Sequence, residues 1–333
     1  MEVFTMLTRR QNLLETIKGG NPDRFVNQYE YLGLVFDPIS MSAAGVCPRG
    51  GTIKNGWGVT ISFPEGLPGP FPDSSGNLCV LKDITQWRET LKMPQIEFSD
   101  EEWADCVAMA DSVDRNDQFV APFIANGIFE KLHYLMGMEE SLMAFYEEPD
   151  DMHDLIDFLA DYEIAAAKEI IAHIHPNAIF HHDDWGSQIS SFMSPEMFEE
   201  FILPAYQKIY GFWKENGVEL IVHHSDSYAA NLVPHMIECG IDIWQGVIST
   251  NDLPKLVKEY GGQISFHGGL NNGVFDVANL DHEALLDATR ELCTECGKHY
   301  LIPGMTMGGP ESSYAGVYEA ATAAIDKVSK EMF

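Results

Sequence analysis

The feature of this sequence that most constrains its fold is a short apolar segment that runs into titratable residues and recurs along the chain. Residues 178–180 run into His181-His182-Asp183-Asp184, and residues 219–222 run into His223-His224-Ser225-Asp226. The same construction returns over 263–269, where it ends in a histidine and two glycines. Short apolar runs of this kind are typical of buried strands. Strands that end one after another in titratable groups predict a common rim of a sheet where those groups meet.

From residue 178 onward, the predicted strands alternate regularly with amphipathic helices. Five strand–helix units follow one another, and polar residues come after each strand rather than before it. Such a series predicts a parallel sheet with helices outside. A barrel and a doubly wound sheet both place functional groups after the strands. No GxGxxG follows the first strand, and functional groups on so many strands favour a barrel. We therefore predict a (β/α)8 TIM barrel with an N-terminal helical and loop extension.

The N-terminal half carries elements of the same kind. We expect a helix capped by Thr8, a strand over 24–34, a helix with a capping box at Ser99 and Glu102, a strand over 119–125 and a long helix over 150–173. Because barrels commonly exceed roughly 250 residues as one unit, residues 1–333 are expected to form a single domain.

Residues 40–76 interrupt this pattern. They contain eight glycines and five prolines, and residues 57–63 are their only strand-like piece. Long loops in compact proteins are usually functional, so we interpret this segment as an insertion that serves as a lid. The alternative is an excursion on the surface that only connects its two ends.

The formal net charge of −31 restricts the partners of this chain. A nucleic-acid-binding protein needs a basic face that displaces counterions, and this composition offers none. With only seven arginines, a substrate that carries many carboxylates would lack its usual bidentate partners. We expect a neutral or cationic small-molecule substrate, although much of the charge can equally serve solubility.

The sequence also predicts no membrane association. No apolar run reaches the roughly 18 residues that a spanning helix needs, and residues 1–10 lack the apolar region of a signal peptide. We therefore expect a cytoplasmic protein. The six cysteines do not resemble a disulfide framework. Cys293 and Cys296 form a single CxxC inside a helical pattern, for which we expect packing in the core.

The doubled histidines cannot all serve one cavity. Adjacent residues on a strand point to opposite faces, so one of His181 and His182, and one of His223 and His224, is expected to face the barrel interior. Imidazole and carboxylate groups both suit zinc. No HxH or HExxH spacing is present, so a site would be assembled from several strands. A metal site and a hydrogen-bonded acid–base network without metal both remain open.

Two carboxylates after a buried strand require an explanation. An aspartate at a barrel rim acts as a proton donor, a metal ligand or a charge stabiliser. For Asp183 and Asp184 we favour such a role over a helix cap or a salt bridge to a neighbouring loop. Glu130 follows the 119–125 strand closely enough to reach the same rim, but its spacing to His133 is also that of a capping contact.

Aromatic residues near the rim predict a flat apolar slot for a substrate. The candidates are Phe36, Trp57, Phe129, Trp185 and Trp244. Aromatic side chains also commonly fill cores, and Trp244 within a strand fits that interpretation equally well. Trp185, directly after the two aspartates, is the strongest candidate.

At these residues the sequence resembles the uroporphyrinogen decarboxylase superfamily, whose fold is a (β/α)8 barrel. The matching segments are 183–188 (DDWGSQ), 194–198 (SPEMF), 224–226 (HSD), 232–234 (LVP), 237–242 (IECGID), 260–262 (YGG) and 268–270 (GGL). The likeness covers most of the chain and is strongest from 178 to 275.

The sequence departs from both main branches of this superfamily. Decarboxylases carry an arginine-containing N-terminal segment that holds the carboxylates of the porphyrinogen, and residues 24–30 (RFVNQYE) lack that motif. Some corrinoid-linked methyltransferases use a His-x-Cys and a distant cysteine to bind a zinc ion that activates a thiol. Here Ser225 or Asp226 stands near the first cysteine, and Met305 near the second.

The resemblance implies a methyltransferase that moves a methyl group from a methoxylated, often aromatic, small molecule to the cobalt of a corrinoid on a partner protein. The reaction that the resemblance implies is acid- or Zn²⁺-assisted C–O cleavage, with His224, Asp226, Asp184 and Asp183 as catalytic residues. The substrate-binding residues would be Trp185, Phe129, Glu130, Trp57 and Trp244. The metal ligands would be His182, His224 and His267, with His181 as a further alternative. The competing interpretations are a cofactor-free decarboxylase acting on a smaller acid and a barrel that binds without catalysis. A homodimer is compatible with the sequence.

Overall fold

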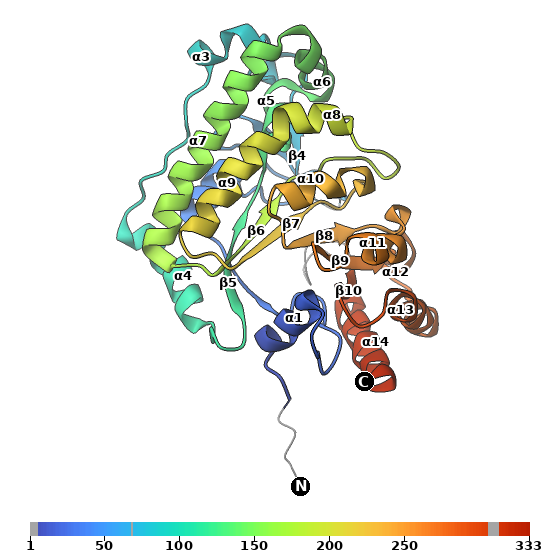
Figure 1. Ribbon diagram of the computed structural model, residues 1–333. Coiled ribbons are helices and arrows are strands. Elements are labelled where there is room, and N and C mark those ends of the chain that lie inside the picture. Colours follow the sequence, from blue (N-terminus) through green and yellow to red (C-terminus); the bar gives the residue numbers. More distant parts are fainter. Residues whose placement is uncertain (1–5, 68, 306–312) are drawn as a thin grey trace.

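Seven parallel strands form the central sheet in the computed structural model, which describes residues 6–67, 69–305 and 313–333. The strands are β1 (Leu32–Val35), β5 (Phe119–Ile124), β6 (Ala178–His182), β7 (Leu220–His224), β8 (Ile243–Val247), β9 (Ser265–Leu270) and β10 (Leu301–Met305). They lie side by side in sequence order and curl into a TIM-barrel-like sheet with helices on its outer side (Figure 1). The predicted fold class is confirmed, with seven parallel strands in the described residues instead of eight.

The difference from eight strands lies where the barrel would close. The strand expected over 24–34 is a strand only at Leu32–Val35, and the residues before it form turns in which Gln28 has a φ of 51°. The Gln28 backbone N–H donates to Pro303 O of β10 at 3.4 Å, and the Gln28 side chain donates to Thr322 Oγ1 at 2.8 Å. Pro303 has no N–H to donate, which is typical of an edge strand. Residues around Gln28 therefore contact β10 without forming a ladder with it.

Fourteen α-helical segments are present in the described residues. They are α1 (Arg9–Lys18), α2 (Pro38–Ala44), α3 (Trp87–Thr90), α4 (Asp100–Ser112), α5 (Ile128–Met136), α6 (Met138–Glu147), α7 (Pro149–Ile174), α8 (Pro195–Met197), α9 (Leu203–Glu215), α10 (Val233–Glu238), α11 (Leu253–Tyr260), α12 (Asn272–Phe275), α13 (His282–Cys296) and α14 (Val317–Met332). Capping boxes at Thr8 and Ser99 start α1 and α4, as expected. None of the described helices is long and apolar enough to cross a membrane.

The insertion predicted over 40–76 is more ordered than its composition suggests. It contains α2 and a three-stranded antiparallel sheet of β2 (Thr52–Lys54), β3 (Thr60–Ser62) and β4 (Phe71–Asp73). Only β3 was expected, because the sequence around β2 carries no apolar run and Pro70 and Pro72 flank and interrupt β4. That the insertion acts as a lid stays a prediction.

Two of the three hydrophobic clusters in the described residues form the main cores of the barrel. One lies inside the sheet and is built from residues at alternate strand positions, among them Leu32, Phe119, Phe180, Val222 and Ile302. The larger one lies between the sheet and the outer helices. Cys293 is buried in α13, where core packing was expected, and none of the six cysteines forms a disulfide.

Candidate active site

A row of polar side chains lies across the C-terminal ends of four neighbouring strands. His182 of β6 pairs in register with His224 of β7, His224 with Gln245 of β8, and Gln245 with His267 of β9. The imidazoles of His182 and His224 stack with 4.4 Å between their centroids. Because side chains on neighbouring strands in register point to the same face, this row faces the barrel interior.

The other two histidines face the helices, as alternation along the strands requires. His181 and His223 both contact the hydroxyl of Tyr210 on α9, through their Nδ1 atoms at 3.0 and 2.7 Å. His181 Nε2 also lies 3.3 Å from Glu163 of α7. His181, named above as an alternative metal ligand, is therefore on the opposite side of the sheet from His182.

Three candidate ligands converge at the rim. One ligand atom each of His182, Asp184 and His224 lie within 4.8 Å of one another, the one such group of three or more found among the described residues. His182 and His224 were expected in a metal site, but the third member is Asp184 instead of His267. His267 is fully buried further round the row, with Nδ1 3.4 Å from the Tyr31 hydroxyl.

Each histidine of this cluster is oriented through its Nδ1 atom. His182 Nδ1 lies 2.7 Å from Oε2 of Glu130, and His224 Nδ1 contacts Oε1 of Gln245 in a short hydrogen bond. Gln245 in turn donates to the Tyr29 hydroxyl at 2.7 Å. With Nδ1 engaged in both rings, Nε2 is the nitrogen that remains for an ion, the arrangement that metal-binding histidines usually have.

Negative charge gathers in this cluster. Glu130, Asp184 and Asp226 are close enough to influence one another, and the Asp226 backbone N–H donates to Asp184 Oδ1 at 2.9 Å. Burial, and then the charge of Asp184, raise the pKa of Asp226 to about 7. Burial opposes the charged form of His182, but Glu130 outweighs it and raises the pKa of His182 to about 10. Three carboxylates beside one imidazolium leave an excess of negative charge that a divalent cation would offset.

The donor set fits zinc. Two imidazole nitrogens and one carboxylate oxygen are a common protein ligand set for a Zn²⁺ ion that keeps an open position for a substrate. Burial lowers the pKa of His224 to about 4, so its imidazole is neutral and has a lone pair for a metal. No cysteine belongs to the cluster in the described residues, so the ligands here are nitrogen and oxygen atoms only.

Asp183 does not join this cluster. Its carboxylate is fully buried and accepts hydrogen bonds from the backbone N–H groups of Phe129 and Glu130, the indole of Trp185 and the hydroxyl of Tyr206. These contacts place it at the N-terminus of α5, where a carboxylate stabilises the helix. A Cβ at Gly127 would lie 2.3 Å from the Asp183 Cβ, so glycine there permits the close approach.

The tryptophans and Phe129 lie inside the protein instead of forming an open slot. Trp185, Trp244 and Phe129 have no exposed surface. Trp185 stacks on His223, and Trp244 donates to Ser225 O at 2.9 Å. Their polar and apolar contacts are those of core residues, so binding of a donor by these three side chains stays a prediction that would require them to move.

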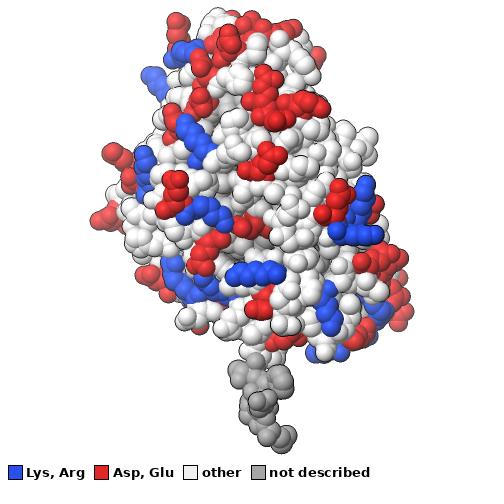
Figure 2. Space-filling view, viewed as in Figure 1, with Lys and Arg blue, Asp and Glu red and all other residues white. Residues whose placement is uncertain are grey.

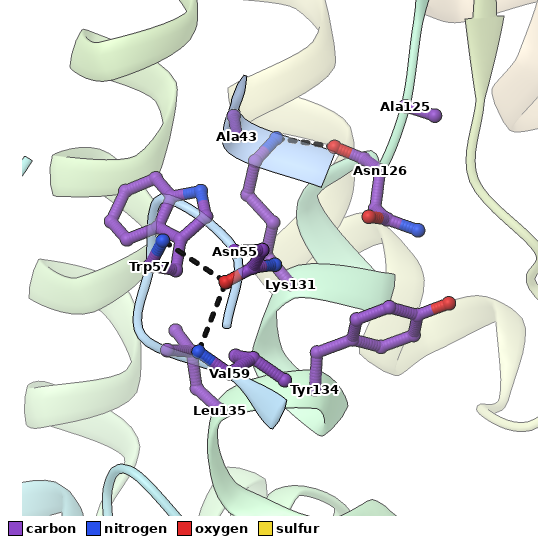
Figure 3. Close-up of a pocket in the computed structure, with 9 residues that line it drawn as sticks. All are labelled: Ala43, Asn55, Trp57, Val59, Ala125, Asn126, Lys131, Tyr134 and Leu135. Atoms are coloured by element: carbon purple, nitrogen blue, oxygen red, sulfur yellow. Dashed lines mark hydrogen bonds between the residues drawn. The ribbon is translucent and has the colours of Figure 1, made fainter. Parts of the chain in front are cut away.

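Trp57 is also buried, and it does not belong to the row. It packs against Tyr162 of α7 and lines a small cavity with Asn55, Lys131 and Tyr134 (Figure 3). The cavity measures about 10 Å³, which is the size of one water molecule. Trp57 therefore anchors the insertion to the barrel's outer helices, and the cavity is too small for an organic substrate.

No arginine contacts the cluster within the described residues. The seven arginines bind Asp117 (Arg9), Glu219 (Arg10), Asp23 (Arg24), Leu67 O (Arg49), Asp151 (Arg88), Ile174 O (Arg115) and Glu331 (Arg290). Acidic and basic side chains are interspersed on the face shown in Figure 2, most of which is neither. A substrate with several carboxylates would find no bidentate partner at this rim.

Gln245 is the residue of this site that the sequence did not single out. Only its place in the sequence could have identified it, because Gln245 is the polar residue of the third strand, 243–247, which follows two strands that end in histidine. Phe123, which packs beside Phe180 under the row, was likewise assigned only to a buried strand.

Comparisons with known proteins agree with this architecture. Methylated-thiol–coenzyme M methyltransferase of Methanosarcina mazei is 27% identical over 190 residues, which cover 55% of this chain and 48% of that protein. The alignment thus spans about half the length of this curated relative. A solved structure described as a methyltransferase from Methanosarcina mazei matches with a TM-score of 0.62 at 15% identity, over 96% of this chain and 99% of that one. That likeness shows the fold.

The family is given by a sequence model that spans most of the barrel. The model described as uroporphyrinogen decarboxylase (URO-D) matches residues 57–307, which include β5 to β10 and every member of the row. The chain belongs to the uroporphyrinogen decarboxylase (URO-D) family.

Proposed function

We propose that this protein is a methyltransferase that takes a methyl group from a methoxylated small molecule and passes it to the cobalt of a corrinoid on a partner protein. The observation that carries the proposal is the convergence of His182, Asp184 and His224, with Glu130 and Gln245 fixing the two imidazoles. The methyltransferase named among the relatives supports the reaction class. The donor and the partner are part of this proposal.

The chemistry of methyl transfer explains what such a cluster would do. An ether methyl is a poor electrophile because its oxygen leaves as an alkoxide or phenoxide, so the oxygen must be protonated or bound by a Lewis acid as the C–O bond breaks. A Zn²⁺ ion held by His182, Asp184 and His224 would supply that Lewis acid. The methyl carbon forms its new bond to the reduced cobalt, and the oxygen leaves with the electron pair of the broken bond.

Asp226 is the residue that we propose to assist this step. Asp226 is partly buried beside Asp184, and its backbone is fixed by the hydrogen bond to Asp184 Oδ1. A carboxyl in this place can hold a proton next to the departing oxygen. His182 and His224 orient the ligand atoms, and Glu130 and Gln245 keep those rings in place.

The ligand set favours an oxygen leaving group over a sulfur one. Thiolate ligands donate charge to zinc and suit soft partners, whereas imidazole and carboxylate leave the ion harder. The cluster offers nitrogen and oxygen atoms alone. A methylated oxygen compound is therefore the donor that we propose, although the curated relative is named for a methylated thiol.

A decarboxylase is the competing activity, and the arginines argue against it. An acid substrate needs a cationic partner at the rim, but the described arginines all bind elsewhere. The cluster itself carries excess negative charge. We therefore expect anionic substrates to be repelled from this site.

The test is methyl transfer to a reduced corrinoid protein, measured as the spectral change of the corrinoid on methylation. Zinc-loaded protein should demethylate a methoxylated donor, a chelator should abolish this, and His224→Ala or Asp184→Ala should remove it. Full activity of both variants would refute the assigned roles. Release of CO₂ from a small acid, without metal or corrinoid, would establish the decarboxylase instead.

A further inference from the structure

We propose that Phe36 and Phe123 form the wall that binds the apolar body of the methyl donor, and that this wall selects a flat, uncharged aromatic molecule. The inference rests on the proposed function and names the substrate class of the same site. Trp185 and Trp244 have no exposed surface. The two phenylalanines at the mouth of the barrel are therefore the residues that we expect to contact the donor.

An unbroken series of rings joins these phenylalanines to the His182–Asp184–His224 cluster. Phe36 lies 5.8 Å from Phe123 between ring centroids, and Phe123 stacks on Phe180 at 5.5 Å. Phe180 lies 5.8 Å from His224, which stacks on His182. The series runs from the surface, where Phe36 is 44% exposed, to the buried His224. Phe36 is the one aromatic residue of the predicted slot that the structure leaves open to solvent.

The strand register explains why these rings lie together. Phe36 directly follows Val35, which ends β1 opposite Pro122 of β5, and Phe123 is the next residue of β5. Phe123 pairs in turn with Phe180 of β6. Because Leu34 and Phe123 both pack on the interior core, the rings continue the inward face of β1 and β5 to its upper end.

The mouth of the barrel is therefore divided into two halves. The side formed by β6 to β9 presents His182, His224, Gln245 and His267, whereas the side formed by β1 and β5 presents Leu34, Phe36 and Phe123. A donor with an apolar ring at one end and an ether oxygen at the other matches this division. Its ring would lie on the phenylalanines while its oxygen reaches the His182–Asp184–His224 cluster.

Charge narrows the donor further. Glu130, Asp184 and Asp226 all lie on the polar side, where Glu130 contacts His182 and the Asp226 backbone contacts Asp184, and their three carboxylates outnumber the two positive charges of a zinc ion held there. A carboxylate on the donor would meet these groups, and within the described residues no arginine contacts the cluster while Lys131 is paired with Glu163. Aromatic pairs also contribute beyond the area that they bury. An uncharged methoxyarene thus fits both the apolar and the acidic side of the barrel mouth, whereas the carboxylate of a methoxybenzoate is repelled by the acidic side.

Direct binding tests the inference without requiring catalysis. Calorimetry on zinc-loaded full-length protein would compare 2-methoxyphenol, uncharged at pH 7, with 4-methoxybenzoate. We expect 2-methoxyphenol to bind at least about tenfold more tightly, since a repelled charge costs roughly that factor. Phe36→Ala and Phe123→Leu should each weaken its binding about three- to tenfold. Phe212→Ala, on the outer helix α9, is the matched control and should bind as the wild type does.

The possible outcomes separate this inference from the proposed function. Equal binding of the two ligands, or unchanged binding in both phenylalanine variants, overturns the inference even where methyl transfer occurs from another donor. Selective binding that depends on Phe36 and Phe123 supports it, even where no methyl reaches the corrinoid and the proposed function fails. Since Phe36 is exposed, its variant stays informative where Phe123→Leu does not fold.

Discussion

The imidazole rings of His182 and His224 stack with 4.4 Å between their centroids and 22° between their planes, although they come from different strands. Each ring is held from behind by a different partner, the Glu130 carboxylate for His182 and the Gln245 amide for His224. Two neighbouring imidazoles would repel one another if both were protonated. The arrangement is therefore suited to a single cation, either the proton on His182 or, once that ring has lost its proton, a metal ion shared by both rings and Asp184.

Removing one of these rings should remove the proposed metal site. His224→Ala leaves two of the three converging ligands, so we expect its Zn²⁺ affinity to fall by at least about 100-fold and methyl transfer to fall with it. A competition titration against a chromogenic chelator measures the affinity. His282→Ala on the exposed surface of α13 is the control. A variant that retains wild-type zinc affinity would exclude His224 from the site.

Glu130 should act on the metal through His182 instead of contacting the donor. Glu130→Gln keeps the size of the side chain but removes the charge that orients and polarises the imidazole. Loss of such a partner typically lowers metal affinity by about 10- to 100-fold. The same titration checks this, with Glu139→Gln on the surface of α6 as the control. If Glu130 bound the donor directly, KM for the donor would rise while zinc affinity stayed constant.

We expect the main role of the Asp183 carboxylate to be in the stability of the fold, and not in catalysis. Its carboxylate accepts four hydrogen bonds from buried donors, including two at the start of α5. Asp183→Ala would leave those donors without an acceptor, and we expect a loss of about 3 to 5 kcal/mol in the free energy of unfolding. Urea denaturation measures this. A variant with native stability but no activity would instead establish a catalytic role.

The sequence predicted the rim of this barrel better than its closure. Alternation along a strand and a repeated strand–helix order are local properties, so the separation of His182 from His181 followed from them. Closure depends on Gln28, whose contacts with Pro303 and Thr322 join residues almost 300 positions apart. No local pattern encodes that approach.

The same limit applies to the third member of the cluster and to the buried tryptophans. His182 and His224 are the last residues of β6 and β7, whereas His267 lies in the middle of β9, and Asp184 lies in the loop after β6. Trp185 follows two aspartates at the rim, yet Asp183 and His223 draw its ring into the core. Proximity to the rim along the sequence does not determine which way a loop residue turns.

A buried ion pair behind the sheet should give the protein a dependence of stability on pH. Lys131 Nζ lies 2.6 Å from Glu163, which also faces His181. Burial alone would raise the pKa of Glu163, but Lys131 and then His181 outweigh it and lower the pKa from 4.5 to about 2. Since the folded state has the lower pKa, this stabilisation is complete above about pH 4.5 and is lost as the pH falls through about 2. It amounts to about 3 kcal/mol at pH 7.

Glu163→Gln tests this ion pair. We expect the variant to be less stable than the wild type at pH 7 by about that amount, and the difference to shrink as the pH falls below about 4.5. Urea denaturation of both proteins at several pH values measures it, and Glu169→Gln, on the same helix α7 but only partly buried, should show no such trend. A difference that stays constant from pH 7 to pH 3 would mean that the loss comes from packing and not from the charge of Glu163.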